Sequence, residues 1–74
     1  MEYDRFNDIA VFIRTMRKKY GYTKKEFAEN TNLGLRFVRE LEQGKLTLKM
    51  DKILVALNFF NSTITVKERP NNYL

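Results

Sequence analysis

The sequence predicts an all-α domain of four to five helices that ends in a short β-strand. Apolar residues recur every three or four positions over most of the chain, and glycines stand where the first and third helices are expected to end. Near the C-terminus the pattern changes to a strict alternation of apolar and polar residues, which predicts the strand. Because the chain has 74 residues, we expect a single domain over 1–74.

The composition excludes several kinds of site and favours a polyanionic partner. The chain has no cysteine and no histidine, which excludes disulfides, thiolate metal sites and histidine catalysis. Carboxylate chemistry is left open, but no pattern indicates it, so we expect no enzyme, no metal and no cofactor. The formal net charge of +5 favours a partner such as nucleic acid. No apolar run approaches the roughly 20 residues that span a bilayer, so we expect a cytoplasmic protein without membrane contact.

The first helix is expected over residues 4–20 and ends at Gly21. Basic residues crowd its last turn, where they interact favourably with the negative end of the helix dipole. One apolar face runs along it, formed by Ile9, Phe12, Ile13, Met16 and Tyr20.

The second helix is expected over residues 24–30. Thr23 is a good N-cap, and Glu26 stands three residues later, which makes a capping box. We expect Phe27 and Ala28 to face inward. The segment TNLG follows as a turn, since asparagine and glycine tolerate unusual backbone angles.

The third helix is expected over residues 35–43, before Gly44, and the fourth over 49–60. The fourth helix carries more apolar residues than one buried face can hold. Its predicted core stripe is Met50, Ile53, Leu54 and Leu57. Its remaining apolar residues are Val55, Phe59 and Phe60, which we expect to lie partly on a partner surface.

The strand is expected over residues 62–68, with Pro70 as its stop and 70–74 as a tail. A lone strand leaves its backbone donors and acceptors unpaired, and the chain offers it no second strand. We therefore expect it to pair with the same strand of a second copy in a two-fold homodimer. The alternative is a flexible tail whose alternation is accidental. The expected dimer interface consists of Phe59, Phe60, Ile64 and Val66.

The third helix has two different faces. Phe37, Val38 and Leu41 form an apolar arc that seats it on a core, and the opposite face is rich in arginine. Arginine can bind guanine through two hydrogen bonds, an exposed leucine can meet a thymine methyl group, and a glutamate can accept from cytosine. For an isolated helix, a merely solvated face would be the simpler interpretation.

The context of the third helix favours recognition. Two short helices joined by a three- to four-residue turn form a helix-turn-helix unit, whose second helix lies in the DNA major groove. The expected base-reading residues are Leu35, Arg36, Arg39 and Glu40. The expected phosphate-binding residues are Lys24, Lys25, Lys45 and Thr47.

Glu42 borders the apolar arc of the third helix, where a carboxylate needs a partner. Arg17 on the first helix is the candidate for a structural ion pair. Alternatively, the Glu42 side chain reaches outward to solvent.

The segment TKKEFAENTNLGLRFVRELEQGK resembles the helix-turn-helix of the phage-repressor-like (XRE) family, whose pattern is roughly T-Q-x-x-L-A-x-x-x-G-V-S-x-x-x-I-S-x-x-E-x-G. The matching residues are Thr23, Phe27, Ala28, Leu33, Val38, Leu41, Glu42 and Gly44. The resemblance covers about residues 5–67 and implies a lambda-repressor-like fold. It also implies that Arg17 pairs with Glu42. Three positions depart from the pattern, namely Lys24, Asn32 and Gly34.

Two segments, LRFVRELEQGK and TLKMDKILVALNFF, followed by a short strand, resemble the sequences of the HipB-like branch of antitoxins. Members of that branch are small dimers that repress their own operon and bind a HipA-type Ser/Thr kinase toxin. The resemblance therefore implies a bacterial repressor that is located with the nucleoid at a palindromic double-stranded DNA operator. A stand-alone XRE-type repressor without a toxin and a helix-turn-helix protein-interaction adaptor are the alternatives.

Overall fold

Four α-helices and no strand are found in the part of the chain that the computed structural model describes, residues 5–45 and 47–65, so the all-helical prediction is confirmed. The helices are α1 (Arg5–Lys19), α2 (Lys24–Thr31), α3 (Leu35–Glu42) and α4 (Met50–Asn58). No helix in these ranges is long and apolar enough to cross a membrane.

The ends of α2 follow from local chemistry. The Thr23 hydroxyl accepts a hydrogen bond from the Glu26 N–H at 3.0 Å, and the Glu26 carboxylate accepts one from the Thr23 N–H at 2.8 Å, which confirms the capping box. At the other end, Asn32 adopts φ 60° and ψ 27°, the left-handed conformation that stops a helix. Asparagine is one of the few residues that reach this conformation cheaply, so the turn forms without glycine at that position.

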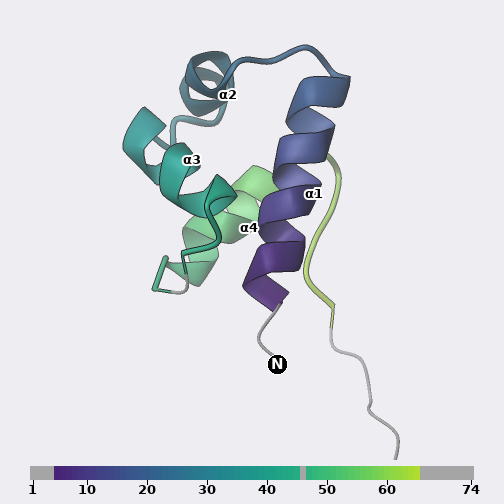
Figure 1. Cartoon of the computed structure of the whole chain (residues 1–74), viewed down its shortest axis with the longest axis vertical. Helices are drawn as coiled ribbons and strands as arrows, with labels where there is room; N and C mark the ends of the chain where they lie inside the picture. The colour runs from purple at the N-terminus through teal and green to yellow at the C-terminus, as the bar shows by residue number, and fades with distance from the viewer. Residues whose placement is uncertain (1–4, 46, 66–74) are drawn as a thin grey trace, which may run out of the picture.

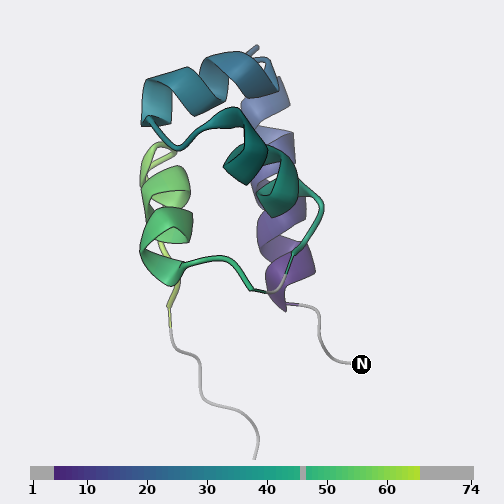
Figure 2. The ribbon, with the colours of Figure 1, turned by 90° about the vertical axis from the view of Figure 1, so that its left-hand side faces the viewer.

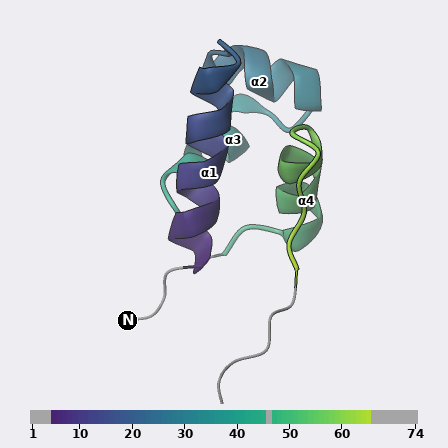
Figure 3. The same cartoon turned by 90° about the vertical axis from the view of Figure 1, so that its right-hand side faces the viewer.

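The helices enclose the core from several sides. α1 and α4 lie side by side, and α2 crosses one end of both (Figures 1 and 3). α3 covers one side of this pair, next to α2, as the view in Figure 2 shows. Residues 62–65 return along the opposite side, so α3 and the C-terminal described segment lie on opposite faces of the domain (Figures 1 and 3).

The core is built mainly from the inner faces of the four helices. Phe27 and Ala28 of α2 are buried, as predicted. α4 differs from its predicted stripe, because Met50 and Leu54 are exposed and Ala56 is buried instead. Six of the nine residues of α4 are apolar, so the helix can present more than one apolar arc, and its neighbours decide which one is buried. The full core is Ala10, Ile13, Phe27, Ala28, Val38, Leu41, Ile53, Ala56, Leu57 and Phe60.

The two phenylalanines after α4 pack against the core of their own domain. α4 ends at Asn58, and Asn61 adopts φ 56°, so the chain turns back on itself. The Phe60 ring is then stacked on Phe27, with ring centroids 5.3 Å apart and an interplanar angle of 7°, and its residue is 9% exposed. Phe59 is half-buried and meets Phe27 edge-on at 5.3 Å. These rings stabilise the monomer, and their place in a dimer interface stays a prediction.

The strand predicted over residues 62–68 is not formed as far as residue 65, and residues 66–68, with Val66, lie outside the described part, as does the tail 70–74. Residues 62–65 lie against the ends of α1 and α4, where Ile64 lines a hollow with Ile9, Phe12 and Leu57. A strand needs a hydrogen-bonding partner, and residues 5–45 and 47–65 of a single copy supply none. Pairing across a dimer therefore stays a prediction.

Candidate nucleic-acid interface

The turn between α2 and α3 is three residues long and its geometry is set by two positive φ angles. Asn32 ends α2, and Gly34 has φ 88° and ψ 145° immediately before α3 begins. Between them, the half-buried side chain of Leu33 packs against the core, and its N–H donates to the Ala28 carbonyl at 3.1 Å. The turn is therefore anchored, and the direction of α3 relative to α2 is fixed.

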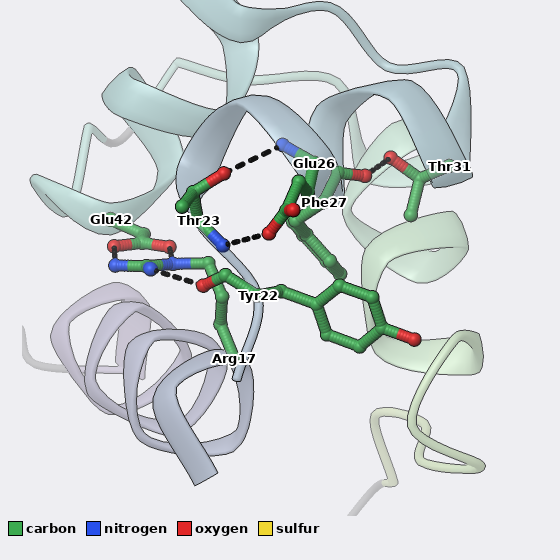
Figure 4. A network of polar contacts seen from close by, with 7 residues as sticks. All are labelled: Arg17, Tyr22, Thr23, Glu26, Phe27, Thr31 and Glu42. Atoms are coloured by element: carbon green, nitrogen blue, oxygen red, sulfur yellow. Dashed lines mark hydrogen bonds and ion pairs between the residues drawn. The ribbon is translucent and has the colours of Figure 1, made fainter. Parts of the chain in front are cut away.

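A buried ion pair fixes the other end of α3. Arg17 of α1 donates to both carboxylate oxygens of Glu42, from Nε at 2.6 Å and from Nη2 at 3.0 Å (Figure 4). The two side chains are 7% and 2% exposed. The structure thus brings together the two residues expected to pair, in the planar, two-bond geometry that arginine and carboxylate favour.

Arg17 makes a third hydrogen bond, to a second partner that the sequence did not indicate. Its Nη1 donates to the Tyr22 carbonyl at 2.8 Å, in the loop before the Thr23 cap (Figure 4). One guanidinium group therefore contacts α3 and the start of α2 from its place on α1. Because each of its three bonds crosses to another segment, Arg17 fixes the orientation of the helix-turn-helix unit on the rest of the domain.

The outer face of α3 carries cations that are free of the core. The Arg36 side chain is 91% exposed, and Arg39 is exposed as well. Glu40 lies one turn after Arg36 on the same face and is more enclosed, with 25% of its side chain exposed. Its carboxylate oxygen Oε2 lies 3.5 Å from Arg36 Nε and 3.2 Å from Lys45 Nζ.

The cations beside Glu40 keep it charged. The hydrogen bond from Lys45 lowers the pKa of Glu40, and the positive charges of Lys45 and Arg36 act in the same direction, whereas partial desolvation opposes them. A carboxylate with a lowered pKa is ionised at neutral pH. The outer face of α3 is therefore a mixed surface, in which one negative charge stands among three positive ones.

The Leu35 side chain is less exposed to a ligand than the helical wheel of α3 predicts. It is half-buried and packs against the core, and it lines a hollow with Lys25, Ala28 and Glu29 of α2. A helical wheel treats α3 alone, but the turn lays the first residue of α3 against α2. Only part of the Leu35 side chain faces outward.

The four residues expected to bind phosphate are all exposed. Lys24 and Lys25 stand in the first turn of α2, where the positive end of the helix dipole adds to their charge. Lys45 and Thr47 follow α3 in the loop to α4. Lys45 differs from the other lysines because its ammonium group donates to Glu40.

Neither ion pair of Glu40 is among the contacts predicted from the sequence. The Arg36–Glu40 pair has the i, i+4 spacing of helix neighbours, so the sequence did contain that signal. The Lys45–Glu40 pair spans five residues across Gly44, whose φ is 80°, and no helical spacing predicts it.

Residues 13–67 match the family model described as helix-turn-helix. The chain belongs to this helix-turn-helix family. It is also similar to an uncharacterized HTH-type transcriptional regulator, y4mF, of Sinorhizobium fredii (strain NBRC 101917 / NGR234), with 34% identity over 59 residues, which are 80% of this chain and 78% of that protein. No solved structure gives a significant match.

The part of the chain that matches the helix-turn-helix family contains each element of the candidate interface. It includes Arg17 and Glu42, both helices of the unit, the exposed arginines and the loop to α4. A rigidly held helix with cations on its outer face, preceded by a lysine-bearing helix start, can dock against a polyanion and direct arginine side chains to its groove.

Proposed function

We propose that the protein is a sequence-specific DNA-binding transcriptional repressor that places α3 in the major groove. The observation that carries this proposal is the arginine-bearing outer face of α3, on a helix whose position is fixed by the buried Arg17–Glu42 pair. The similarity to a protein named as an HTH-type transcriptional regulator supports it. Groove recognition requires both features, because base contacts depend on side-chain positions within fractions of an ångström.

The proposed contacts follow from exposure and position. Arg36 and Arg39 read base edges or adjacent phosphates, and Leu35 and Glu40 adjust the choice of base. Backbone phosphates are held from the start of α2 and from the loop after α3, by Lys24, Lys25, Lys45 and Thr47.

We propose further that two copies act together on a palindromic operator. Leu54 and Val55 of α4 and Ile64 of the C-terminal segment are all exposed, on neighbouring surface that Ser62 and Thr63 connect. Pairing of two copies through this surface and through residues 62–68 would give the backbone donors and acceptors of the predicted strand their hydrogen-bond partners. The two-fold axis of such a dimer would match the symmetry of a palindromic operator, whose half-sites lie about 34 Å apart, one turn of DNA.

DNA recognition is tested with Arg36→Ala and the charge-matched control Arg14→Ala, an exposed arginine of α1. Fluorescence anisotropy measures the affinity of each variant for a duplex of the protein's own promoter and for every single-base variant of it. We expect Arg36→Ala to lose about 1–3 kcal/mol and to relax the preference at one position. Arg14→Ala is expected to weaken all duplexes equally or not at all.

The salt dependence separates the outcomes. Binding is expected to weaken steeply as salt rises, because each phosphate contact releases counterions. If Arg36→Ala weakens all duplexes equally, Arg36 is a phosphate contact. A flat salt response, or no binding to the promoter, would leave the helix-turn-helix as a protein-interaction adaptor.

The dimer is tested with two valines of similar exposure. Val55 of α4 is 45% exposed and Val11 of α1 is 51% exposed, so glutamate at either position should be tolerated by the fold. Sedimentation equilibrium is expected to give a dimer for the native chain and for Val11→Glu, and a monomer for Val55→Glu. Dimers of both variants would exclude this face of α4 from the interface.

We also propose the HipB-like antitoxin role, with a HipA-type Ser/Thr kinase as the second partner. Its support is the resemblance of residues 35–60 to that branch. Copurification with the product of an adjacent kinase-like gene is the expected result. Without a complex at micromolar concentration, the function that remains is a stand-alone repressor.

A further inference from the structure

Glu40 joins two cations that come from opposite ends of α3. Arg36 stands one turn earlier on the helix, and Lys45 follows it in the loop to α4. The same carboxylate oxygen, Oε2, is 3.5 Å from Arg36 Nε and 3.2 Å from Lys45 Nζ. One negative charge therefore neutralises part of the charge of two of the residues proposed to contact DNA.

The carboxylate is the inner member of this group. The Glu40 side chain is 25% exposed, whereas those of Arg36 and Lys45 are 91% and 47% exposed. The two cations can turn outward toward a ligand, but Glu40 stays close to the surface of α3. Any phosphate that draws both cations away must approach a carboxylate that has lost its counter-charges.

We propose that Glu40 is a specificity-determining residue that competes with DNA phosphates for Arg36 and Lys45. This inference rests on the proposed DNA-binding function. On a DNA sequence without matching bases, breaking the Glu40 pairs gains only phosphate contacts and brings like charges together, which is unfavourable. On the operator, the contacts of the freed Arg36 with base edges offset that cost. Glu40 therefore weakens non-specific binding more than operator binding.

The test compares Glu40→Gln with Glu29→Gln, which removes the same charge from α2. Glu29 is exposed, and no ion pair of its carboxylate is seen in residues 5–45 and 47–65. The probes are a duplex of the protein's own promoter and a scrambled duplex of equal length and composition. Both variants should keep the helical circular dichroism of the native chain, since the side chains are at the surface.

We expect Glu40→Gln to bind the scrambled duplex on the order of tenfold more tightly, with a steeper salt dependence. The slope of the logarithm of affinity against the logarithm of salt should grow by about 0.9 for each additional phosphate contact. The affinity for the promoter duplex should change much less, so the ratio of the two affinities falls. Glu29→Gln should leave that ratio unchanged.

A second comparison shows whether Glu40 acts through its partners. In the background Arg36→Ala with Lys45→Ala, Glu40→Gln should no longer steepen the salt dependence, because no paired cation remains to be released. A full effect in that background would mean that general charge repulsion is sufficient, and the proposed competition would be wrong. An unchanged affinity ratio for Glu40→Gln alone would also overturn it.

Different results would reject the DNA-binding function and the role of Glu40. If the native chain binds neither duplex at low salt, the DNA-binding function falls, and the role of Glu40 falls with it. If the native chain prefers its promoter but Glu40→Gln retains the same preference, the DNA-binding function stands and only the role of Glu40 is rejected.

Discussion

Replacing Glu42 with glutamine isolates the contribution of the buried ion pair. Glutamine keeps the shape of the side chain but removes its charge, so the guanidinium group of Arg17 stays buried without a counter-ion. Of its three hydrogen bonds, only the one to the Tyr22 carbonyl, at 2.8 Å, is independent of Glu42. Removing one partner of a buried pair costs about 3–5 kcal/mol.

That loss is large for a domain of this size. A chain of 74 residues is expected to have a free energy of unfolding of about 4–11 kcal/mol. Glu42→Gln should therefore remove about a quarter or more of the free energy of unfolding. Since each kcal/mol shifts the Tm of a small domain by about 4–8 °C, the Tm should fall by at least about 12 °C.

The double variant Arg17→Met with Glu42→Leu should behave differently from the single one. Replacing both charges with apolar groups is often neutral or stabilising by about 1–4 kcal/mol, because no charge has to be desolvated. Against this gain, the Tyr22 carbonyl loses its donor, at a cost of about 1–3 kcal/mol. The two effects offset each other, so the free energy of unfolding of the double variant should lie within about 3 kcal/mol of that of the native chain.

Urea unfolding followed by far-ultraviolet circular dichroism measures both variants. Glu29→Gln is the control, since an exposed substitution should change stability by no more than about 0.5 kcal/mol. The reasoning is refuted if Glu42→Gln unfolds like this control, or if the double variant is as unstable as the single one. Added salt should change the cost of Glu42→Gln little, because buried charges are weakly screened.

Three further changes test the local structure by the same unfolding measurement. Thr23→Ala removes the side-chain cap of α2 and should cost about 0.5–2 kcal/mol, whereas Thr23→Ser should cost much less; equal losses would rule out the cap as the cause. Asn32→Gly should be neutral or stabilising and Asn32→Ala destabilising by about 1 kcal/mol, because φ is 60° at this position; the opposite order would contradict the left-handed turn. Ile53 is fully buried, so Ile53→Ala should lower the free energy of unfolding by about 2–5 kcal/mol. Leu54 is exposed, so Leu54→Ala should lower it clearly less. Similar losses at both positions would mean that a different face of α4 is buried.

The four helices and both ends of α2 were predictable from sequence because the forces that set them are local. The Thr23 cap and its Glu26 partner lie three residues apart, and the turn at Asn32 depends on the properties of one residue. The burial of Phe27 follows from the same short pattern. Each of these features depends only on residues that are close in the chain, so the spacing of residue types in the sequence predicts it.

The orientation of α4 and the place of the last aromatic rings were not predictable in the same way. Ile53 and Leu54 are equally apolar, and contacts with other helices decide which of them is buried. Phe59 and Phe60 were counted as part of a longer helix, but α4 ends at Asn58. Asn61, an asparagine at positive φ, was the available signal for that earlier end and for the return of the chain.

In the candidate interface too, features set by local spacing were predictable and features set by contacts between elements were not. The outward position of Arg36 follows from the helical wheel of α3. The partial burial of Leu35 does not, since it depends on how the turn lays α3 against α2. The position of Lys45 beside Glu40 depends on the path of the chain at Gly44, which is set by a positive φ and not by helical spacing.

The aromatic rings that follow α4 also determine which parts of the domain can unfold separately. Tyr20 is stacked on Phe60 at 6.0 Å, and Tyr22 meets Phe59 edge-on at 5.5 Å, so the loop before α2 is joined to the chain about forty residues later. Arg17 holds the same loop to α3. With both ties in place, neither α2 nor α4 can detach without disturbing the other. Their amide hydrogens should therefore exchange with solvent through one shared opening, at a common free energy close to that of global unfolding.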